Sequence, residues 1–360
     1  MNLDDLERLG YYDPAAAGAD ERRALLELAI EAGADVDEIA VAIDEGWLHA
    51  VPIQRAIVGP ARRISVTEAG ARAGLAAEPA QRLWSALGLE ARECTEDDVA
   101  VFEAYALSFA AWGEAETLHL ARVTASALAG LADAEVALAR ATLEAPLRAS
   151  GGDNVAVGRV YRDFGREVLP RLHAAVSRLH AHHLSAAGRR YALWGTPPTE
   201  ASTARVYVGF ADLVGFTALG NRLEPSQVDR LLRAFEARAH DAATGVTSRL
   251  VKLIGDEAMF VAGSASDAVA IASALLDDPT LPPMRVGIAA GQVVTRAGDA
   301  FGRPVNLAAR LVAIAEPGEV LVDGATAAAL GPEAVERRSA RALPGFPEPV
   351  EVYAVSRGGG

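Results

Sequence analysis

The sequence predicts an α+β protein in which an all-helical region precedes a ferredoxin-like domain. In the first half, Ala, Leu, Glu and Arg recur at helical spacing, and glycines separate the helical segments. In the second half, strand and helix patterns follow one another in the order βαββαβ, which is the ferredoxin-like pattern. We therefore expect an all-helical domain at residues 1–190, a linker at residues 191–204 and an α+β domain at residues 205–360.

The composition fits a globular chain of about two domains. The chain has 360 residues, of which 51% are hydrophobic and 23% charged, and a domain typically has about 100–200 residues. Its single cysteine, Cys94, excludes an internal disulfide and a cysteine-cluster metal site. This use of cysteine favours a reducing compartment.

The charge and hydropathy of the chain argue against binding to nucleic acids or membranes. Lys and Arg total 34 and Asp and Glu total 48, which gives a formal net charge of −14, and an acidic chain repels phosphate backbones and anionic lipids. No uncharged stretch approaches the ~18 apolar residues of a membrane span, and the acidic N-terminus does not resemble a signal peptide. We expect a cytoplasmic protein.

Several helix boundaries can be placed in the first half. An amphipathic pattern predicts a helix at Asp20–Ala32, with Gly33 as its C-cap and the acidic segment Asp35–Glu38 at the start of the next helix. The last helix of this half is expected at about Val155–Leu184, with a kink or break at Pro170.

Two features of the helical half invite a functional interpretation. The segments Ile64–Leu75 and Pro79–Leu89 have a helix-turn-helix pattern, but Arg82 is the only cation of the second segment. Because a DNA-reading helix needs basic and polar residues, we prefer a structural helical module. A nearby set of apolar residues could line a pocket for a lipid or another small molecule, or belong to the core: Phe102, Tyr105, Leu107, Phe109 and Trp112.

The second half supplies the elements of the βαββαβ pattern. The predicted elements are the strand Val206–Phe210, the helix Pro225–His240, two strands within Arg249–Val261, the helix Asp267–Leu276 and the strand Met284–Ala290. Between the two strands of Arg249–Val261, the pair Gly255-Asp256 is a hairpin signal.

Three segments of this half carry polar residues beside strands and glycines. They are Phe210–Thr217 with Asp212 at the end of a strand, Lys252–Asp256 around the hairpin tip, and Gly298–Arg310 with Asp299, Asn306 and Arg310. Asn306 and Arg310 are four residues apart, so they project from one face of a helix. Singly, each residue is typical of a turn or a surface, but their joint occurrence favours a shared site.

These segments resemble the catalytic domain of class III nucleotidyl cyclases, which form cyclic AMP or cyclic GMP from a nucleoside triphosphate. The resemblance covers about Arg205–Val355 and includes the tail Leu343–Tyr353, which is similar to the closing strands of that family. It implies an adenylate cyclase that converts ATP to 3′,5′-cyclic AMP and pyrophosphate by a two-metal mechanism.

The resemblance assigns roles to six residues. Asp212 and Asp256 would bind two divalent ions, Mg²⁺ or Mn²⁺, which prefer carboxylate oxygens. Lys252 and Asp299 would bind adenine, because adenine offers an acceptor at N1 and a donor at N6, whereas guanine presents the reverse pattern. The remaining two residues are the catalytic pair, Asn306 to orient the ribose and Arg310 to stabilise charge on the α-phosphate.

The resemblance also implies the assembly. In that family the metal-binding aspartates come from one chain and the other four residues from a second chain. Because this chain carries the complete set, the expected assembly is a homodimer whose two active sites are both shared between the chains.

The layout of the whole chain resembles the actinobacterial pH-responsive cyclases, in which an N-terminal helical domain autoinhibits the catalytic domain. Four of the seven histidines lie just before the predicted linker, at His173, His180, His182 and His183. Since histidine changes charge near a pKa of ~6.5, this cluster could act as a pH switch. The alternative is a solvent-exposed helix face that happens to carry histidines.

Two other functions are weighed against adenylate cyclase activity. A guanylate cyclase is disfavoured by Lys252 and Asp299, which match adenine. A catalytically silent, cyclase-like sensor or transcriptional regulator is disfavoured by the complete catalytic set.

Overall fold

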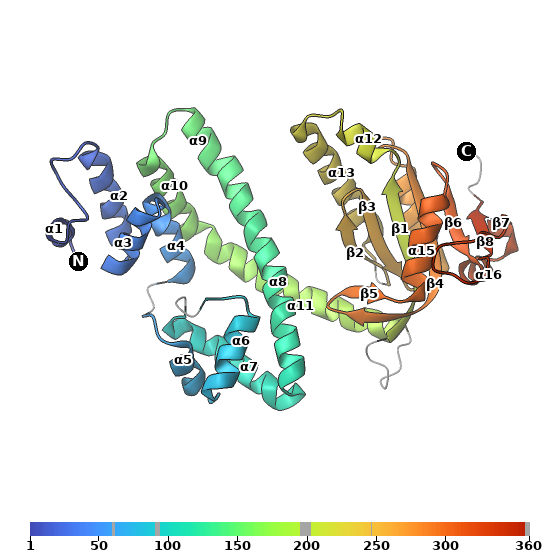
Figure 1. Cartoon of the computed structure of the whole chain (residues 1–360), viewed down its shortest axis with the longest axis horizontal. Coiled ribbons are helices and arrows are strands. Elements are labelled where there is room, and N and C mark those ends of the chain that lie inside the picture. Colours follow the sequence, from blue (N-terminus) through green and yellow to red (C-terminus); the bar gives the residue numbers. More distant parts are fainter. Residues whose placement is uncertain (60–61, 91–93, 195–202, 246, 357–360) are drawn as a thin grey trace. The chain divides into compact units, whose positions relative to one another are not determined.

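The computed structural model describes residues 1–59, 62–90, 94–194, 203–245 and 247–356 (Figure 1). Contacts divide the chain into two compact units, Met1–Leu179 and His180–Gly360. The first unit is helical and the second contains a β-sheet with helices, so the predicted α+β class is confirmed. In the described residues, no helix combines the length and the apolar character that crossing a membrane requires.

The first unit is built from short helices and one long one. Its elements before α11 are α1 Leu3–Arg8, α2 Ala19–Glu31, α3 Val36–Asp44, η1 Leu48–Ala50, α4 Val51–Val58, α5 Val66–Arg72, α6 Ala77–Ala86, η3 Glu96–Asp98, α7 Val99–Trp112, α8 Glu114–Ala139, the π-helix η4 Arg140–Glu144, α9 Ala145–Ala149 and α10 Asn154–Glu167.

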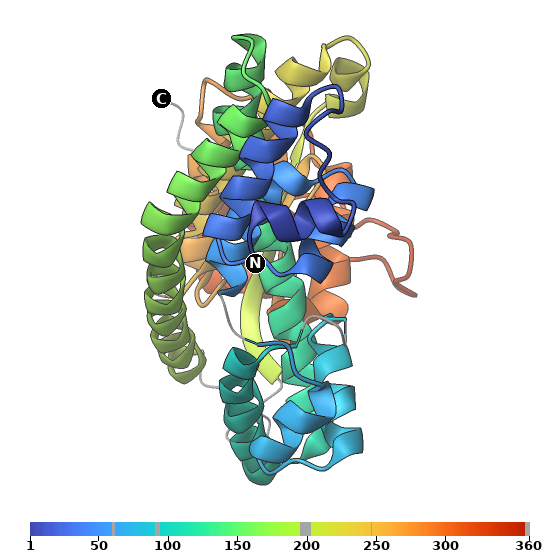
Figure 2. The ribbon, with the colours of Figure 1, turned by 90° about the vertical axis from the view of Figure 1, so that its left-hand side faces the viewer.

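Helices α1 to α4 form one hydrophobic core with α10. Leu26 of α2, Ile39 of α3 and Val51 of α4 are fully buried together, and α10 packs against α2 and α4. Helices α1 to α4, in blue, gather around the N-terminus in Figure 1 and again in Figure 2. The predicted boundary between α2 and α3 is present, since Gly33 has a positive φ of 84° and the side chain of Asp35 accepts a hydrogen bond from the Glu38 amide.

Helices α5 to α8 form a second core. Trp84 of α6 stacks on Phe102 of α7 with ring centroids 5.4 Å apart. Helices α5 and α6 cross closely at Gly70, where an added Cβ would lie 2.3 Å from the Cβ of Ala80. This crossing is the helix pair expected from the helix-turn-helix pattern.

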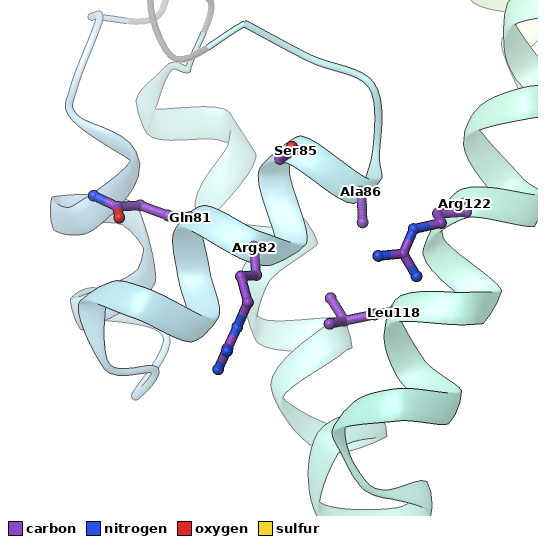
Figure 3. Close-up of a pocket in the computed structure, with 6 residues that line it drawn as sticks. All are labelled: Gln81, Arg82, Ser85, Ala86, Leu118 and Arg122. Atoms are coloured by element: carbon purple, nitrogen blue, oxygen red, sulfur yellow. The ribbon is translucent and has the colours of Figure 1, made fainter.

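The five apolar residues considered as a pocket lining do not share one cavity. Phe102 lies in the core, while Leu107 and Trp112 are 75% and 59% exposed. A shallow pocket of about 320 Å³ lies instead between α6 and α8 (Figure 3). Its lining residues are Gln81, Arg82, Ser85, Ala86, Leu118 and Arg122.

Helix α11, Leu169–Leu193, differs from the predicted last helix of the first half. The break falls at Val168 between α10 and α11, and Pro170 lies in the first turn of α11, where its missing N–H breaks no helical hydrogen bond. The helix also continues beyond Leu184, to Leu193, into the stretch predicted as a linker. Of that linker, residues 195–202 lie outside the described residues.

The second unit contains an eight-stranded sheet. Its elements after α11 are β1 Thr203–Leu213, α12 Phe216–Gly220, α13 Pro225–Ala243, β2 Arg249–Ile254, β3 Glu257–Ala262, α14 Ala265–Leu276, β4 Met284–Arg296, β5 Asp299–Phe301, α15 Arg303–Ile314, β6 Val320–Asp323, α16 Gly324–Leu330, η6 Pro332–Ala334, β7 Val335–Arg337 and β8 Val352–Val355.

The strand order is that of a ferredoxin-like sheet with an extension. Strands β2, β3, β1 and β4 lie side by side, and β1 is antiparallel to both β3 and β4. The sheet continues from β4 through β6 and β8 to β7, and β5 pairs with the end of β4. Strand β8 begins within the tail Leu343–Tyr353 that was expected to close the sheet and ends at Val355.

Each face of this sheet has its own core. Residues of α13, α14 and α16 pack on one face, and residues of α15 pack on the other. Helix α15 approaches β4 closely at Gly287, where an added Cβ would lie 2.3 Å from the amide nitrogen of Val312. The position of α15, and of the residues that project from it, therefore depends on this glycine.

Candidate active site

The two aspartates predicted to bind metal ions lie at neighbouring backbone positions. Asp212 is near the end of β1, and Asp256 is in the turn between β2 and β3, where Gly255 has a positive φ of 65°. The Leu213 amide donates a hydrogen bond to the Asp256 carbonyl at 3.1 Å. The strand end and the hairpin tip are thereby joined, and the two residues lie at the same edge of the sheet.

Two charged residues that the sequence analysis missed lie beside this pair. Arg285 of β4 donates from Nε to Asp212 Oδ2 at 2.7 Å and from Nη1 to the Ala313 carbonyl at 3.2 Å. Glu257 faces Asp212 across β1 and β3. Burial, together with the charges of Asp212 and Asp256, raises the pKa of Glu257 to about 7.

These residues fit divalent ions whose coordination is completed by oxygen atoms from other ligands. Three carboxyl groups lie near one guanidinium group, so the local charge favours a cation. Within the described ranges no group of three or more His, Cys, Asp or Glu side chains forms a cage for a metal ion. Two carboxylates with phosphate oxygens are a common Mg²⁺ environment, and Asp212 and Asp256 match that case.

Lys252 and Asp299 lie together although they are 47 residues apart in the sequence. Lys252 Nζ donates to Asp299 Oδ2 at 2.5 Å, and Asp299 Oδ1 accepts from the Ala300 amide at 2.8 Å. Lys252 comes from β2 and Asp299 begins β5. An ammonium group has three donors, so Lys252 keeps donors for a further acceptor while it is paired.

Asn306 and Arg310 project from α15 on adjacent turns. Both side chains are exposed. The backbone N–H of Asn306 donates to the Gly302 carbonyl at 3.3 Å, at the start of the helix. In the part of the chain that the structure describes, neither side chain makes a hydrogen bond or an ion pair. They are thus available to a ligand or a second chain.

The four histidines of the proposed pH switch are all on α11. Each of the four, His173, His180, His182 and His183, is exposed. No hydrogen bond or ion pair joins their side chains to other residues of the described ranges. The structure therefore does not link them to the six residues above.

The neighbours of the predicted site could not be found by sequence pattern. Arg285 contacts Asp212 only because β1 and β4 pair in the register that sets these two residues opposite each other. Glu257 directly follows the Gly-Asp hairpin signal, which gave no separate indication of a third carboxyl group. The hydrophobic pattern of a strand indicates which face a residue takes, but it does not name the residue opposite it on a strand far away in the chain.

Comparison with known proteins identifies the family. The chain is 35% identical to an adenylate cyclase of Streptomyces coelicolor over 289 residues, covering 77% of this chain and 74% of that protein. It is 32% identical to a pH-sensitive adenylate cyclase of Mycobacterium tuberculosis over 383 residues, covering 99% of this chain and 92% of the relative. An uncharacterized protein of M. tuberculosis is 35% identical over 330 residues, with 89% and 85% covered.

Among solved structures, the adenylyl cyclase CyaB from Pseudomonas aeruginosa is 26% identical with a TM-score of 0.38, covering 43% of this chain and 96% of that chain. No family model matches the chain. The relatives of similar length and the ferredoxin-like sheet agree with the resemblance found in the sequence. The chain is an enzyme that belongs to the class III adenylate cyclases.

Proposed function

We propose that this adenylate cyclase converts ATP to 3′,5′-cyclic AMP and pyrophosphate at two equivalent sites of a homodimer. The observation that carries the substrate assignment is the pair of Lys252 and Asp299. The lysine supplies a donor for adenine N1, and the aspartate supplies an acceptor for the N6 amino group. Guanine presents an oxygen acceptor in place of that amino group, so it would leave the carboxylate without a donor.

Asp212 and Asp256 are the residues that would hold two divalent ions, Mg²⁺ or Mn²⁺. When bound, such ions lower the pKa of the ribose 3′-hydroxyl and offset the charge of the leaving pyrophosphate. The contribution of the chain is to keep two carboxylates at one edge of the sheet. Arg285 holds Asp212 in place from β4, so the carboxylate is already oriented before a ligand arrives.

Arg310 and Asn306 would act on the reacting groups themselves. The guanidinium of Arg310 would donate to the α-phosphate as negative charge develops there, and the Asn306 amide would orient the ribose. Both side chains are exposed and without partners in the described residues, which suits groups that meet their ligand across an interface.

The surface near these residues supports a dimer of catalytic units. Val294 and Phe301 are 46% and 49% exposed, and they are paired neighbours on β4 and β5. Large apolar side chains are costly in water. Burial of this patch against a second copy would bring Lys252, Asp299 and α15 of one chain toward the aspartates of the other.

Competition between nucleotides tests the substrate assignment. With equimolar ATP and GTP and Mn²⁺, the full chain should form cyclic AMP in large excess over cyclic GMP. Predominant cyclic GMP would contradict the role of Lys252 and Asp299. Absence of both products at high protein concentration would favour a silent, cyclase-like scaffold.

We further propose that the helical unit regulates activity in response to pH through the histidines of α11. The support is the similarity, over almost the whole chain, to a relative named as pH-sensitive, together with four exposed histidines at the division between the units. Protonation would add up to four positive charges to one helix.

Replacement of all four histidines tests this regulation. The variant with His173, His180, His182 and His183 changed to Gln should lose most of the dependence of activity on pH between about 5.5 and 8. His240→Gln, which changes an exposed histidine of α13, is the control and should keep the wild-type profile. An unchanged profile in the fourfold variant would refute the histidine switch while leaving the enzyme assignment intact.

A further inference from the structure

Strand β2 contains an irregularity that sets the direction of two cationic side chains. Arg249 and Lys252 are three residues apart, which on a regular strand would place them on opposite faces. The register shifts between Leu250 and Lys252, so Arg249 pairs with Val261 and Lys252 pairs with Met259. Because these two partners are two residues apart on β3, Arg249 and Lys252 face the same side of the sheet.

Both side chains reach the hairpin between β4 and β5. Lys252 contacts the Asp299 carboxylate at 2.5 Å, and Arg249 Nη2 donates to the carbonyl of the preceding residue, Gly298, at 2.5 Å. The bulged strand thus holds two consecutive positions of the hairpin. One contact is made to the side chain that is proposed to bind adenine, and the other to the backbone that presents it.

The hairpin turn needs such support. Ala297 and Gly298 have positive φ values of 53° and 78°, and Arg296 pairs with Asp299 across the turn. An alanine disfavours the left-handed region because its Cβ lies too close to the following carbonyl oxygen, so the turn conformation is not the one that its sequence prefers. The hydrogen bond from Arg249 stabilises the conformation that places Asp299 beside Lys252.

The partly buried guanidinium group of Arg249 reduces stability, so packing alone does not explain an arginine at this position. Burial and the nearby charge of Arg190 both lower the pKa of its guanidinium. In the described residues it has no ion pair, and its hydrogen bonds go to the carbonyl oxygens of Gly298 and Leu250. The nearby charge of Asp299 acts in the opposite direction without offsetting the burial, and a partly buried cation that forms no ion pair is destabilising relative to an apolar side chain.

The end of α11, which belongs to the same unit as the sheet, contacts the segments next to Arg249 and the β4–β5 turn. The Tyr191 hydroxyl donates to Thr295 Oγ1 on β4 at 2.9 Å, close to the turn. The buried Trp194 donates from Nε1 to the Thr247 carbonyl at 2.9 Å, just before β2 begins. One contact therefore reaches the segment that leads into β2, and the other reaches β4 next to the turn that Arg249 contacts.

We propose that Arg249 is a positioning residue for substrate selection, which sets Asp299 beside Lys252 by fixing the β4–β5 turn through the Gly298 carbonyl. The inference rests on the proposed function of Lys252 and Asp299 in binding adenine. Arg249 itself does not contact the substrate. Its loss should therefore change which nucleotide is selected more than how fast the bound nucleotide reacts.

The test compares nucleotide selection in the full chain. Arg249→Met should reduce the ratio of kcat/KM for ATP over GTP about tenfold, mainly by raising KM for ATP, because a lost hydrogen bond to a charged donor costs that much. Arg249→Lys, which keeps the charge but not the fork of donors, should lie between this variant and the wild type. Arg233→Met changes an exposed arginine of α13 that pairs with Asp229 and should leave the ratio unchanged.

A merely structural role predicts a different result. The unfolding temperature or kcat of Arg249→Met and Arg249→Lys would then fall, while the ratio of ATP to GTP stays at the wild-type value. That outcome would overturn the inference. In the background of Asp299→Ala, Arg249→Met should have little further effect on the ratio, because the two residues act on one contact; full additivity would also overturn it.

Variants of the base-binding pair separate this inference from the proposed function. If Lys252→Ala and Asp299→Ala change the ratio but Arg249→Met does not, the role of Arg249 is wrong and the adenine assignment stands. If Lys252→Ala and Asp299→Ala leave the ratio unchanged, the adenine assignment is wrong and the inference falls with it.

Discussion

At the scale of single residues, the acidic edge of the sheet contains more negative charge than its one arginine can balance. Asp212 pairs with Arg285, whereas Glu257, opposite Asp212 and directly after Asp256, is partly buried and has no ion pair in the described residues. Like charges and burial both disfavour the ionised form of a carboxyl group. The pKa of Glu257 is therefore raised, and this carboxyl group keeps its proton to a higher pH than usual.

This response predicts a pH-dependent effect of Glu257→Gln on stability in the presence of a metal chelator. The pKa of Glu257 is raised from 4.5 to about 7 in the folded chain, so between these values the folded state binds an additional proton. Stability then falls as pH rises through this window, and the ionised carboxylate remains a cost above it. The Gln variant should be more stable at pH 8 by about 1 kcal/mol after allowance for solvent screening, with little difference near pH 4.

Thermal unfolding at pH 4.5, 6 and 8 measures this effect. A stability gain that is the same at all three pH values would show that charge is not its cause. Glu236→Gln, which changes a carboxyl group on the exposed side of α13, provides a control for the substitution itself.

At the scale of elements, the position of α15 depends on the lack of a side chain at Gly287 of β4. A Cβ at Gly287 would meet the backbone of α15 at 2.3 Å from the Val312 amide nitrogen and 2.5 Å from the Ala308 carbonyl oxygen. A flexible side chain can relieve a close contact by changing its rotamer, but backbone atoms cannot, so helix α15 would have to move. Asn306 and Arg310 would move with it.

Gly287→Ala should therefore affect both stability and catalysis. We expect a loss of about 2–3 kcal/mol in the free energy of unfolding from overpacking, and a fall in kcat that exceeds any rise in KM, since the catalytic pair is displaced. Denaturant unfolding and steady-state kinetics measure the two effects. Gly130→Ala on α8, where nothing lies within 4 Å, should be neutral or slightly stabilising; equal behaviour of the two variants would contradict the close approach.

The elements were more predictable than the contacts between them. Hydrophobic periodicity is local, so the order βαββαβ follows from the sequence, as do the helix starts predicted at Asp20, Val155 and Pro225. The pairing of Asp212 with Arg285 does not, because it depends on the register between two strands far apart in the chain. The bulge in β2 lies within a hairpin of consecutive strands, but no residue pattern marked the extra residue. The end of α11 was predicted too early, at Leu184, although Ala and Arg residues continue the helical pattern beyond it to Leu193.

At the scale of the whole molecule, the helix-turn-helix pattern lacks the surface that DNA binding would need. Arg82 of α6 is paired with Glu78 at 3.2 Å and with Glu114 of α8 at 2.7 Å. Its charge is thus balanced within the unit, and α6 packs against α8. This favours a structural module over a transcriptional regulator, and it leaves regulation of the cyclase as the role proposed for the helical unit.

We propose that each active site is built from two copies of the chain, with Asp212 from one and Arg310 from the other. The direct measurement uses Asp212→Ala and Arg310→Ala chains that carry different tags, are co-expressed and are purified through both tags. Each variant alone should form almost no cyclic AMP from ATP. The mixed dimer has one intact site of two, so it should recover about half of the wild-type activity. A mixed dimer as inactive as its parents would contradict the shared site.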